Sequence, residues 1–218
     1  WVSIYYFFDL SWFKIPWTPL ALIGTAVAFV IGFQNNAAYG RIWEARKIWG
    51  GIVNTSRTFG VFVQDMVNNE HAKKPATESE LQKEIDTLTN RHIAWMTALR
   101  FAMREPRKWE TTMNHKTNKE WGMRPPEKDT MLECELKSNI SEDDFNYVMS
   151  KNNKATAMLY LQSHHLKELK DKGLIWEFSY LELEGIIQEL FTLQGKSERI
   201  KNFPYPRQFA TLNHFFMW

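Results

Sequence analysis

Residues 15–49 read IPWTPLALIGTAVAFVIGFQNNAAYGRIWEARKIW, and they join an apolar segment to a charged one that contains two tryptophans. Residues 15–40 carry no charged side chain, and the apolar part, residues 15–33, is long enough as a helix to cross a hydrocarbon core about 30 Å thick. A buried core helix of a soluble protein is the alternative interpretation. The pattern favours a membrane-spanning helix over about residues 19–36, starting near Pro19.

The charged residues that follow this segment predict its direction. Arg41, Arg46 and Lys47 come directly after the apolar run, and positive charge at the end of a span is typical of the cytoplasmic side. We therefore expect the span to run from outside to inside. Helical spacing continues beyond the span and predicts one apolar face, made of Ile42, Ala45, Trp49, Ile52, Val53, Ser56 and Gly60.

Composition excludes several classes of protein. The 218 residues are 44% hydrophobic and 24% charged, which indicates a folded chain, and the mean hydropathy of −0.43 argues against many membrane spans. The net charge of +2 does not suggest a nucleic-acid partner. The single cysteine, Cys134, excludes an intramolecular disulfide, so we expect most of the chain to lie in a reducing compartment.

Helical patterns account for most of the remaining sequence, and no long β alternation interrupts them. Residues 71–78 are predicted to form a loop, and residues 106–140 a surface excursion with little regular structure. Leu81, His92 and Trp95 belong to the predicted buried stripe of the next helix. The expected helices cover a segment from after Thr77 or Ser79 to Pro106, a segment starting at Ser141, residues 153–172, and residues 174–200.

A second membrane approach follows at FPYPRQFATLNHFFMW, residues 203–218. Pro204 and Pro206 prevent a continuous helix, after which an apolar stretch opens with Arg207 at its start. We expect an all-α membrane protein in three parts: residues 1–36 in the membrane, residues 37–203 as a cytosolic helical region, and residues 204–218 starting the next transmembrane helix. Because both ends of the chain lie in apolar stretches, we expect it to be part of a longer protein.

Two sets of residues are candidates for a functional site. Thr25, Phe29 and Phe33 recur at intervals of four and share one helix face, although such a stripe also serves ordinary helix packing. His164 and Glu168, with His165 beside them, have the spacing of helical metal ligands. Two ligands do not close a metal site, and a solvated helix face is favoured. The sequence carries no phosphate loop, nucleophile elbow or catalytic carboxylate pair, so we expect no enzyme activity, no metal and no cofactor.

Two segments resemble the bestrophin family, particularly its bacterial and fungal members. IGFQNNAAYGRIWEARKIWGGIVNTSRTF, residues 31–59, is similar to the segment after the family's second transmembrane helix, and GKSERIKNFPYP, residues 195–206, to the lead-in to the third. The resemblance implies a homopentameric ion channel in the plasma (inner) membrane, with a central pore and a cytosolic helical vestibule. Its expected partners are other copies of the chain, the lipid bilayer and small monovalent ions.

The resemblance also implies which residues line the pore. Phe29 and Phe33 align with the hydrophobic neck, and Thr25 stands where the family often has a larger apolar residue. Tyr205 aligns with the cytosolic aperture, where an aliphatic residue is common. We expect chloride or other anions to pass, because aromatic ring edges carry partial positive charge. The alternatives are a monovalent cation channel of the same fold, a membrane-anchored helical scaffold without transport activity, and a metal-dependent enzyme using His164, His165 and Glu168.

Overall fold

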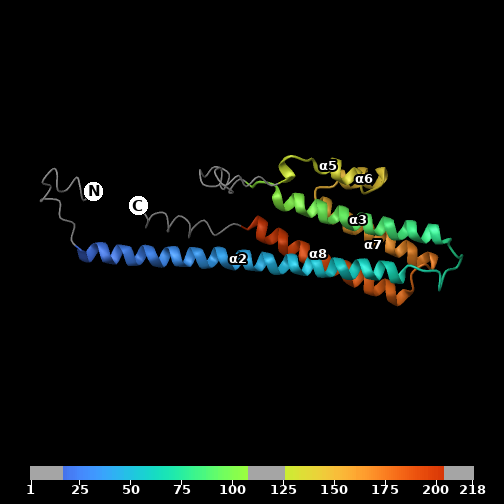
Figure 1. The fold of residues 1–218 in the computed structure, drawn as a ribbon, viewed down its shortest axis with the longest axis horizontal. Helices are drawn as coiled ribbons and strands as arrows, with labels where there is room; N and C mark the ends of the chain where they lie inside the picture. The colour runs from blue at the N-terminus through green and yellow to red at the C-terminus, as the bar shows by residue number, and fades with distance from the viewer. Residues whose placement is uncertain (1–16, 108–125, 204–218) are drawn as a thin grey trace. The chain divides into compact units, whose positions relative to one another are not determined.

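The computed structural model describes residues 17–107 and 126–203, and within these ranges it contains helices and no strand (Figure 1). Contacts divide the chain into two units, residues 1–44 with 204–218, and residues 45–203. The helices, with no strand among the described residues, confirm the expected all-α fold. The helices are α2 (Trp17–Met66), α3 (Glu78–Arg104), the 3₁₀ turn η2 (Pro126–Lys128), α5 (Leu132–Lys137), α6 (Glu142–Met149), α7 (Lys154–Lys172) and α8 (Glu177–Asn202).

Helix α2 is one continuous helix of 50 residues, which confirms that the apolar helix continues into the charged segment. The structure describes this helix from Trp17 onward, so Pro19, near which the sequence predicts the start, lies within its described part. Within the described parts of the chain, α2 alone is long and apolar enough to cross a membrane. No part of its apolar window is buried among the residues that the structure describes.

Local signals set the ends of α3 and α7 where the sequence predicts them. The Thr77 side chain caps α3 by accepting from the Glu80 N–H, and the Glu80 carboxylate accepts from the Thr77 N–H at 2.7 Å. Helix α7 ends at Gly173, whose φ of 80° is the left-handed conformation that glycine tolerates best. A Cβ there would also lie 2.4 Å from the His71 carbonyl oxygen.

Helix α8 starts later than expected. Leu174 and Ile175 are buried in the turn after α7, and Trp176 is the N-cap residue. The two apolar residues extend the core through the turn itself. Their burial is a tertiary requirement, and a sequence pattern cannot separate it from helical periodicity.

The core of residues 45–203 is formed by α3, α7, α8 and the C-terminal part of α2. The predicted α3 stripe is confirmed at Leu81, Ile85, Leu88, His92, Trp95 and Leu99, while Met103 is half-buried. The predicted α2 face is confirmed only in part, because Ile52 is buried and Ala45, Ser56 and Gly60 are half-buried, whereas Ile42, Trp49 and Val53 are exposed. The buried side chains of α2 are Ile48, Ile52, Phe59 and Val63.

The reason lies in the neighbouring helices. A Cβ on Gly51 would approach the Leu193 side chain of α8 to 3.0 Å, so this side of α2 meets its partner closely. The sequence pattern contains two apolar faces on α2, and only the position of α8 and α3 decides which one the chain itself covers.

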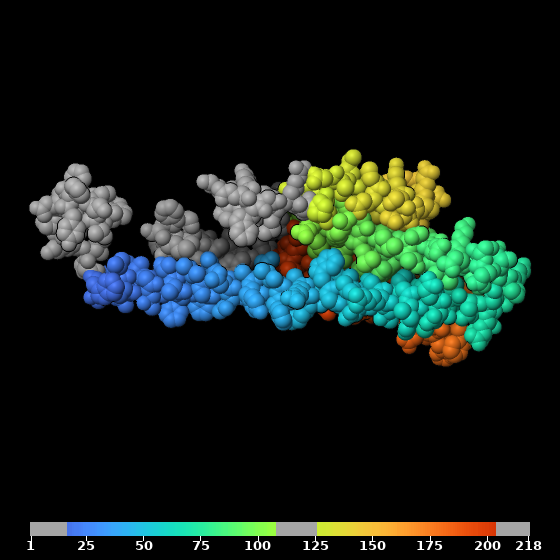
Figure 2. Space-filling view, viewed as in Figure 1, coloured from blue at the N-terminus to red at the C-terminus, as the bar shows by residue number. Residues whose placement is uncertain are grey.

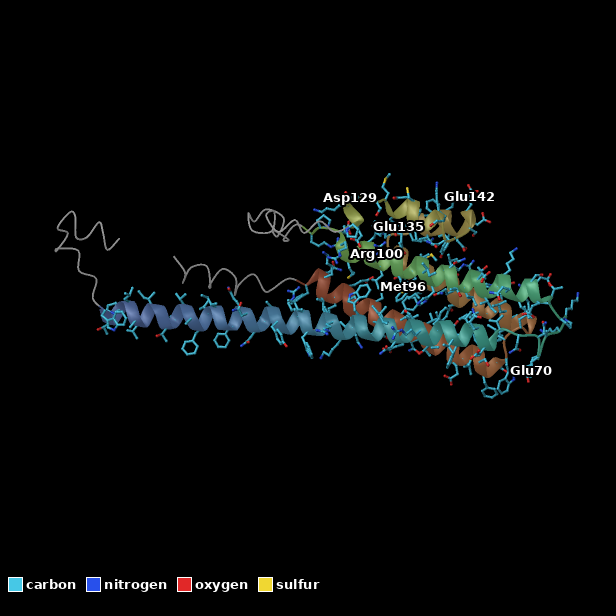
Figure 3. The ribbon with its side chains drawn as sticks, in the orientation of Figure 1. Glu70, Met96, Arg100, Asp129, Glu135 and Glu142 are labelled. Atoms are coloured by element: carbon cyan, nitrogen blue, oxygen red, sulfur yellow. The ribbon has the colours of Figure 1, made fainter. Side chains whose placement is uncertain are left out.

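Helices α5 and α6 lie over α3 on the face shown in yellow and green in Figure 2. The expectation of little regular structure between residues 106 and 140 is therefore wrong for residues 126–137, where η2 and α5 form and Leu136 is fully buried. Arg100 of α3 holds this segment by ion pairs to Glu127 and Glu135, and Figure 3 shows Arg100 beside Glu135. One buried leucine and one bridging arginine order a stretch that lacks strong helix signals.

Candidate functional site

The predicted neck residues all lie on α2 and are exposed. Phe29 has 64% of its surface exposed and Phe33 68%, and successive members of the Thr25–Phe29–Phe33 set are four residues apart, so they share one face of the helix. The Thr25 hydroxyl donates to the Ala21 carbonyl at 2.9 Å, which occupies its proton within the helix. Two large aromatic side chains thus project from an apolar helix without cover from the described residues.

Further along α2, a second exposed apolar set follows the charged junction. Tyr39 and Trp43 stack with ring centroids 6.2 Å apart, and Ile42 is 69% exposed. Trp49 and Val53 continue the exposed surface. Tyr205 and the predicted next transmembrane helix, residues 204–218, lie outside the described residues.

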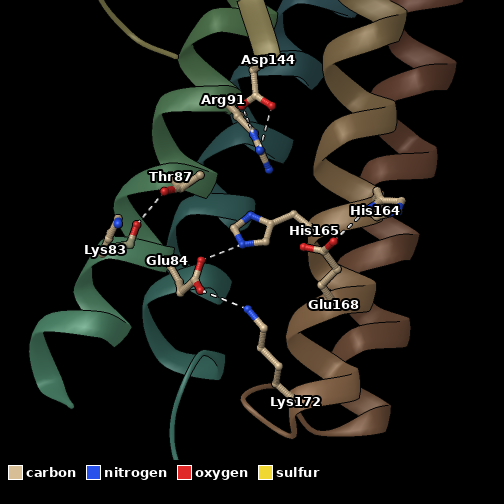
Figure 4. A network of polar contacts seen from close by, with 9 residues as sticks. All are labelled: Lys83, Glu84, Thr87, Arg91, Asp144, His164, His165, Glu168 and Lys172. Carbon is tan, nitrogen blue, oxygen red and sulfur yellow. Dashed lines mark hydrogen bonds and ion pairs between the residues drawn. The ribbon is translucent and has the colours of Figure 1, made fainter. Parts of the chain in front are cut away.

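The two adjacent histidines of α7 point to different partners (Figure 4). His164 is exposed, and its Nδ1 lies 3.4 Å from Glu168 Oε1. His165 is buried, and its Nε2 lies 2.8 Å from Oε2 of Glu84 on α3, whose other oxygen lies 3.4 Å from Lys172 Nζ. Burial lowers the pKa of His165, while the hydrogen bond to Glu84 raises it. The structure therefore does not bring His164, His165 and Glu168 together as ligands of one ion, and the described residues contain no group of three potential metal ligands.

A bidentate ion pair joins α3 to α6 in the same region. Arg91 Nε donates to Asp144 Oδ2 at 2.7 Å, and Nη2 donates to Oδ1 at 3.0 Å. Asp144 also donates its N–H to the side chain of the N-cap residue Ser141, as the sequence predicts. The acidic start of α6 therefore serves both the helix end and its attachment to α3.

A buried polar network links α3, α7 and α8. The Trp95 indole N–H donates to Gln194 Oε1 at 2.9 Å, and Gln194 Nε2 donates to Thr156 and Glu198 at 2.9 and 2.8 Å. Gln194 is 2% exposed, so these bonds satisfy an amide that would otherwise be buried at a cost. Asn153, the α7 N-cap, also donates to Glu198.

His92 lies among aromatic side chains in the core of residues 45–203. Its ring stacks on Phe59 of α2 at 4.8 Å between centroids and lies 5.2 Å from the Trp95 ring. The sequence places His92 on the buried stripe, but helix periodicity contains no signal for what its ring meets. The pairs Glu84–His165, Arg91–Asp144 and Trp95–Gln194 were likewise not predicted, because each joins residues more than fifty positions apart.

The whole chain can now be compared with known proteins. A family model described as bacterial/fungal bestrophin protein matches residues 2–218. The chain belongs to that family. The family match confirms the resemblance found at residues 31–59 and 195–206, and it extends across the intervening helices.

Curated bestrophin relatives carry channel names. The chain is 23% identical over 217 residues to the voltage-dependent anion channel-forming protein YneE of Escherichia coli (strain K12), covering 97% of this chain and 60% of that protein. It is 56% identical over 41 residues to a protein of the same description from Ralstonia nicotianae, covering 19% of this chain and 13% of that protein. These names describe channels and not enzymes. This chain spans about three fifths of the length of the first relative.

Solved structures show that the bestrophin fold is shared. A bacterial bestrophin homolog from Klebsiella pneumoniae superposes with a TM-score of 0.73 at 18% identity, covering 98% of this chain and 65% of that one. At this identity the likeness establishes the fold.

Proposed function

We propose that this bestrophin chain is part of a homopentameric channel that passes small monovalent ions passively, with chloride or other anions favoured. The observation that carries the proposal is the α2 helix, which combines an apolar segment able to cross a membrane with two exposed phenylalanines on one face. The names of the anion channel-forming relatives support the same reading.

In this proposal Thr25, Phe29 and Phe33 form the neck of the pore. Five copies around an axis would place each side chain against its symmetry mates, giving stacked rings. Rings of phenylalanine can control flow by excluding water from a narrow passage, without binding an ion. The Thr25 ring would be the most polar of the three.

Tyr205 is proposed to form the cytosolic aperture, on the strength of the sequence resemblance alone. A tyrosine would narrow the exit more than an aliphatic residue and would present a hydroxyl to passing ions. Residues 37–203 would then lie in the cytosol and residues 19–36 in the plasma (inner) membrane, as the positive charges after Asn36 indicate.

Self-assembly is supported by the apolar side chains that the single chain leaves exposed. Ile42, Trp43 and Trp49 of α2 and Leu181 and Phe191 of α8 are all at least one third exposed. Contiguous exposed apolar surface is typical of a protein or membrane interface. Copies of the same chain are the proposed occupants of the cytosolic part of this surface.

Anions are favoured over cations because the neck presents aromatic rings, whose edges carry partial positive charge. A monovalent cation channel of the same fold remains the second candidate, since apolar rings carry no net charge. The scaffold alternative predicts no current at all.

Planar bilayer recordings of the full-length protein test this function. We expect current through the wild type, with a reversal potential in a KCl gradient that lies toward the chloride equilibrium value. Phe29→Ala and Phe33→Ala should each raise the conductance or weaken gating, because each widens one ring. Ile31→Ala is the matched control, since Ile31 is exposed on the same helix but two residues away from both phenylalanines.

Each result has one meaning. A wild type without current, in a correctly assembled oligomer, would favour the scaffold. Reversal toward the potassium value would favour the cation channel. If Phe29→Ala and Phe33→Ala behave like Ile31→Ala, the neck does not lie at these residues.

A further inference from the structure

His92 occupies an unusual position for an ionisable side chain. It is 5% exposed, and its ring contacts those of Phe59 of α2 and Trp95 of its own helix, with centroid distances of 4.8 and 5.2 Å. Neither ring nitrogen has a hydrogen-bond partner among the residues that the structure describes. Buried polar groups are usually hydrogen-bonded, so this ring needs an explanation.

The charged groups around His92 do not compensate for a proton on its ring. Arg91, its neighbour in α3, is bound to Asp144, and His165 of α7 is bound to Glu84. Burial is the cause that lowers the pKa of His92, to about 4. Exposed ionisable side chains occupy the surfaces of the helices that pack here: Arg57 and Asp65 on α2, Lys167 and Glu168 on α7, and Glu189 and Lys196 on α8.

We propose that His92 makes the packing of α2 against α3 sensitive to acid. The neutral imidazole packs against the two aromatic rings as a flat, largely apolar group. A proton would place a positive charge and a second N–H donor in the same buried space, where neither ring nitrogen has a hydrogen-bond partner among the described residues. The faces of Phe59 and Trp95 would offset part of that cost by cation–π attraction, but they cannot replace the lost hydration.

His165 shows what a compensated arrangement looks like. Its Nε2 lies 2.8 Å from the Glu84 carboxylate, so a protonated ring would keep an ion-pair partner. The two buried histidines therefore differ in whether a carboxylate lies within hydrogen-bond distance of the ring. Burial still lowers the pKa of His165 despite the hydrogen bond to Glu84, so acid acts against both packed rings, but only at His165 is a counter-charge in hydrogen-bond contact.

The direction of the pH effect follows from proton binding. When α2 separates from α3, the exposed ring takes up a proton near its ordinary pKa of 6.5, whereas the packed ring does so near 4. The open state therefore binds more protons between these values, and opening becomes easier as the pH falls from 6.5 to 4. At pH 5 the opening equilibrium should be larger by ~30-fold than it would be without this ionisation.

Hydrogen exchange of the full-length protein in detergent tests the proposal without requiring ion conduction. Peptides covering residues 48–66 of α2 are compared between wild type and His92→Leu at pH 7, 6 and 5, so that the intrinsic pH dependence of exchange cancels. We expect similar exchange at pH 7 and exchange in the wild type that is faster by ~30-fold at pH 5. His164→Leu is the control, because His164 is exposed and should follow the wild type.

His92→Gln provides a second, polar variant that cannot be protonated at these pH values. It should show the flat profile of His92→Leu even if it exchanges faster at every pH. The proposal is overturned if the ratio of wild type to either variant does not change with pH. It is also overturned if His164→Leu produces the same change as His92→Leu.

Discussion

At the scale of single residues, the ion pair between Arg91 and Asp144 is the best-defined polar contact between helices. Its two hydrogen bonds measure 2.7 and 3.0 Å, and the two side chains are only 16% and 10% exposed. Exposed ion pairs contribute little, but a half-buried bidentate pair has fixed geometry and limited screening. Its loss leaves the Arg91 guanidinium poorly compensated.

We expect Asp144→Asn to lower the free energy of unfolding by about 2 kcal/mol, since the shape is kept and the charge is removed. Thermal unfolding of the full-length protein in detergent measures the change. Asp143→Asn is the matched control, because Asp143 is the preceding residue in the same first turn and is exposed. Equal effects of the two substitutions would mean that the helix end, and not the pair with Arg91, is what Asp144 stabilises.

At the scale of elements, helix ends are set locally and helix faces are set by neighbours. The capping box at Thr77 and the left-handed Gly173 can be read from adjacent residues. The face that α2 buries cannot, because Trp49 and Ile52 are both apolar, yet Ile52 is buried and Trp49 is exposed. Leu136 shows the same dependence, since a short helix with few signals is ordered by its contact with α3.

The turn between α7 and α8 offers a test at this scale. Gly173→Ala should destabilise the protein by at least about 1 kcal/mol, because alanine disfavours a positive φ. The added Cβ would also meet the His71 carbonyl oxygen at 2.4 Å. Gly185→Ala is the control within α8, where a Cβ meets no described atom within 4 Å and should stabilise the helix by about 0.5–1 kcal/mol. A tolerated Gly173→Ala in thermal unfolding would show that the turn can rearrange.

At the scale of the whole molecule, the exposed apolar side chains of α2 are the basis for the proposed oligomer. A single chain leaves Phe29, Phe33 and Trp43 exposed, and an axial pore needs several copies. We expect the full-length protein in detergent to have the mass of five chains by light scattering combined with size-exclusion chromatography. A monomeric mass would contradict the axial pore, whatever the bilayer recordings show.

Several features of this protein follow from its sequence alone. The uncharged residues 15–40 indicate the span, and capping residues indicate the start of α3 and α6 and both ends of α7, because each of these depends on neighbours within a few positions. The direction of the span, expected from the following arginines and lysine, stays a prediction. The family could also be identified from residues 31–59. The roles of Thr25, Phe29, Phe33 and Tyr205, and the division at residues 36 and 203, stay predictions.

Tertiary structure alone decided which polar side chains meet. His165 meets Glu84, Trp95 meets Gln194, and His92 meets two aromatic rings, although all three lie on helices that the sequence predicts. The helical spacing of apolar residues predicts whether a residue faces inward, because that depends on its own helix. What it faces depends on segments far away in the chain, and for His92 that difference separates an ordinary core position from an acid-sensitive one.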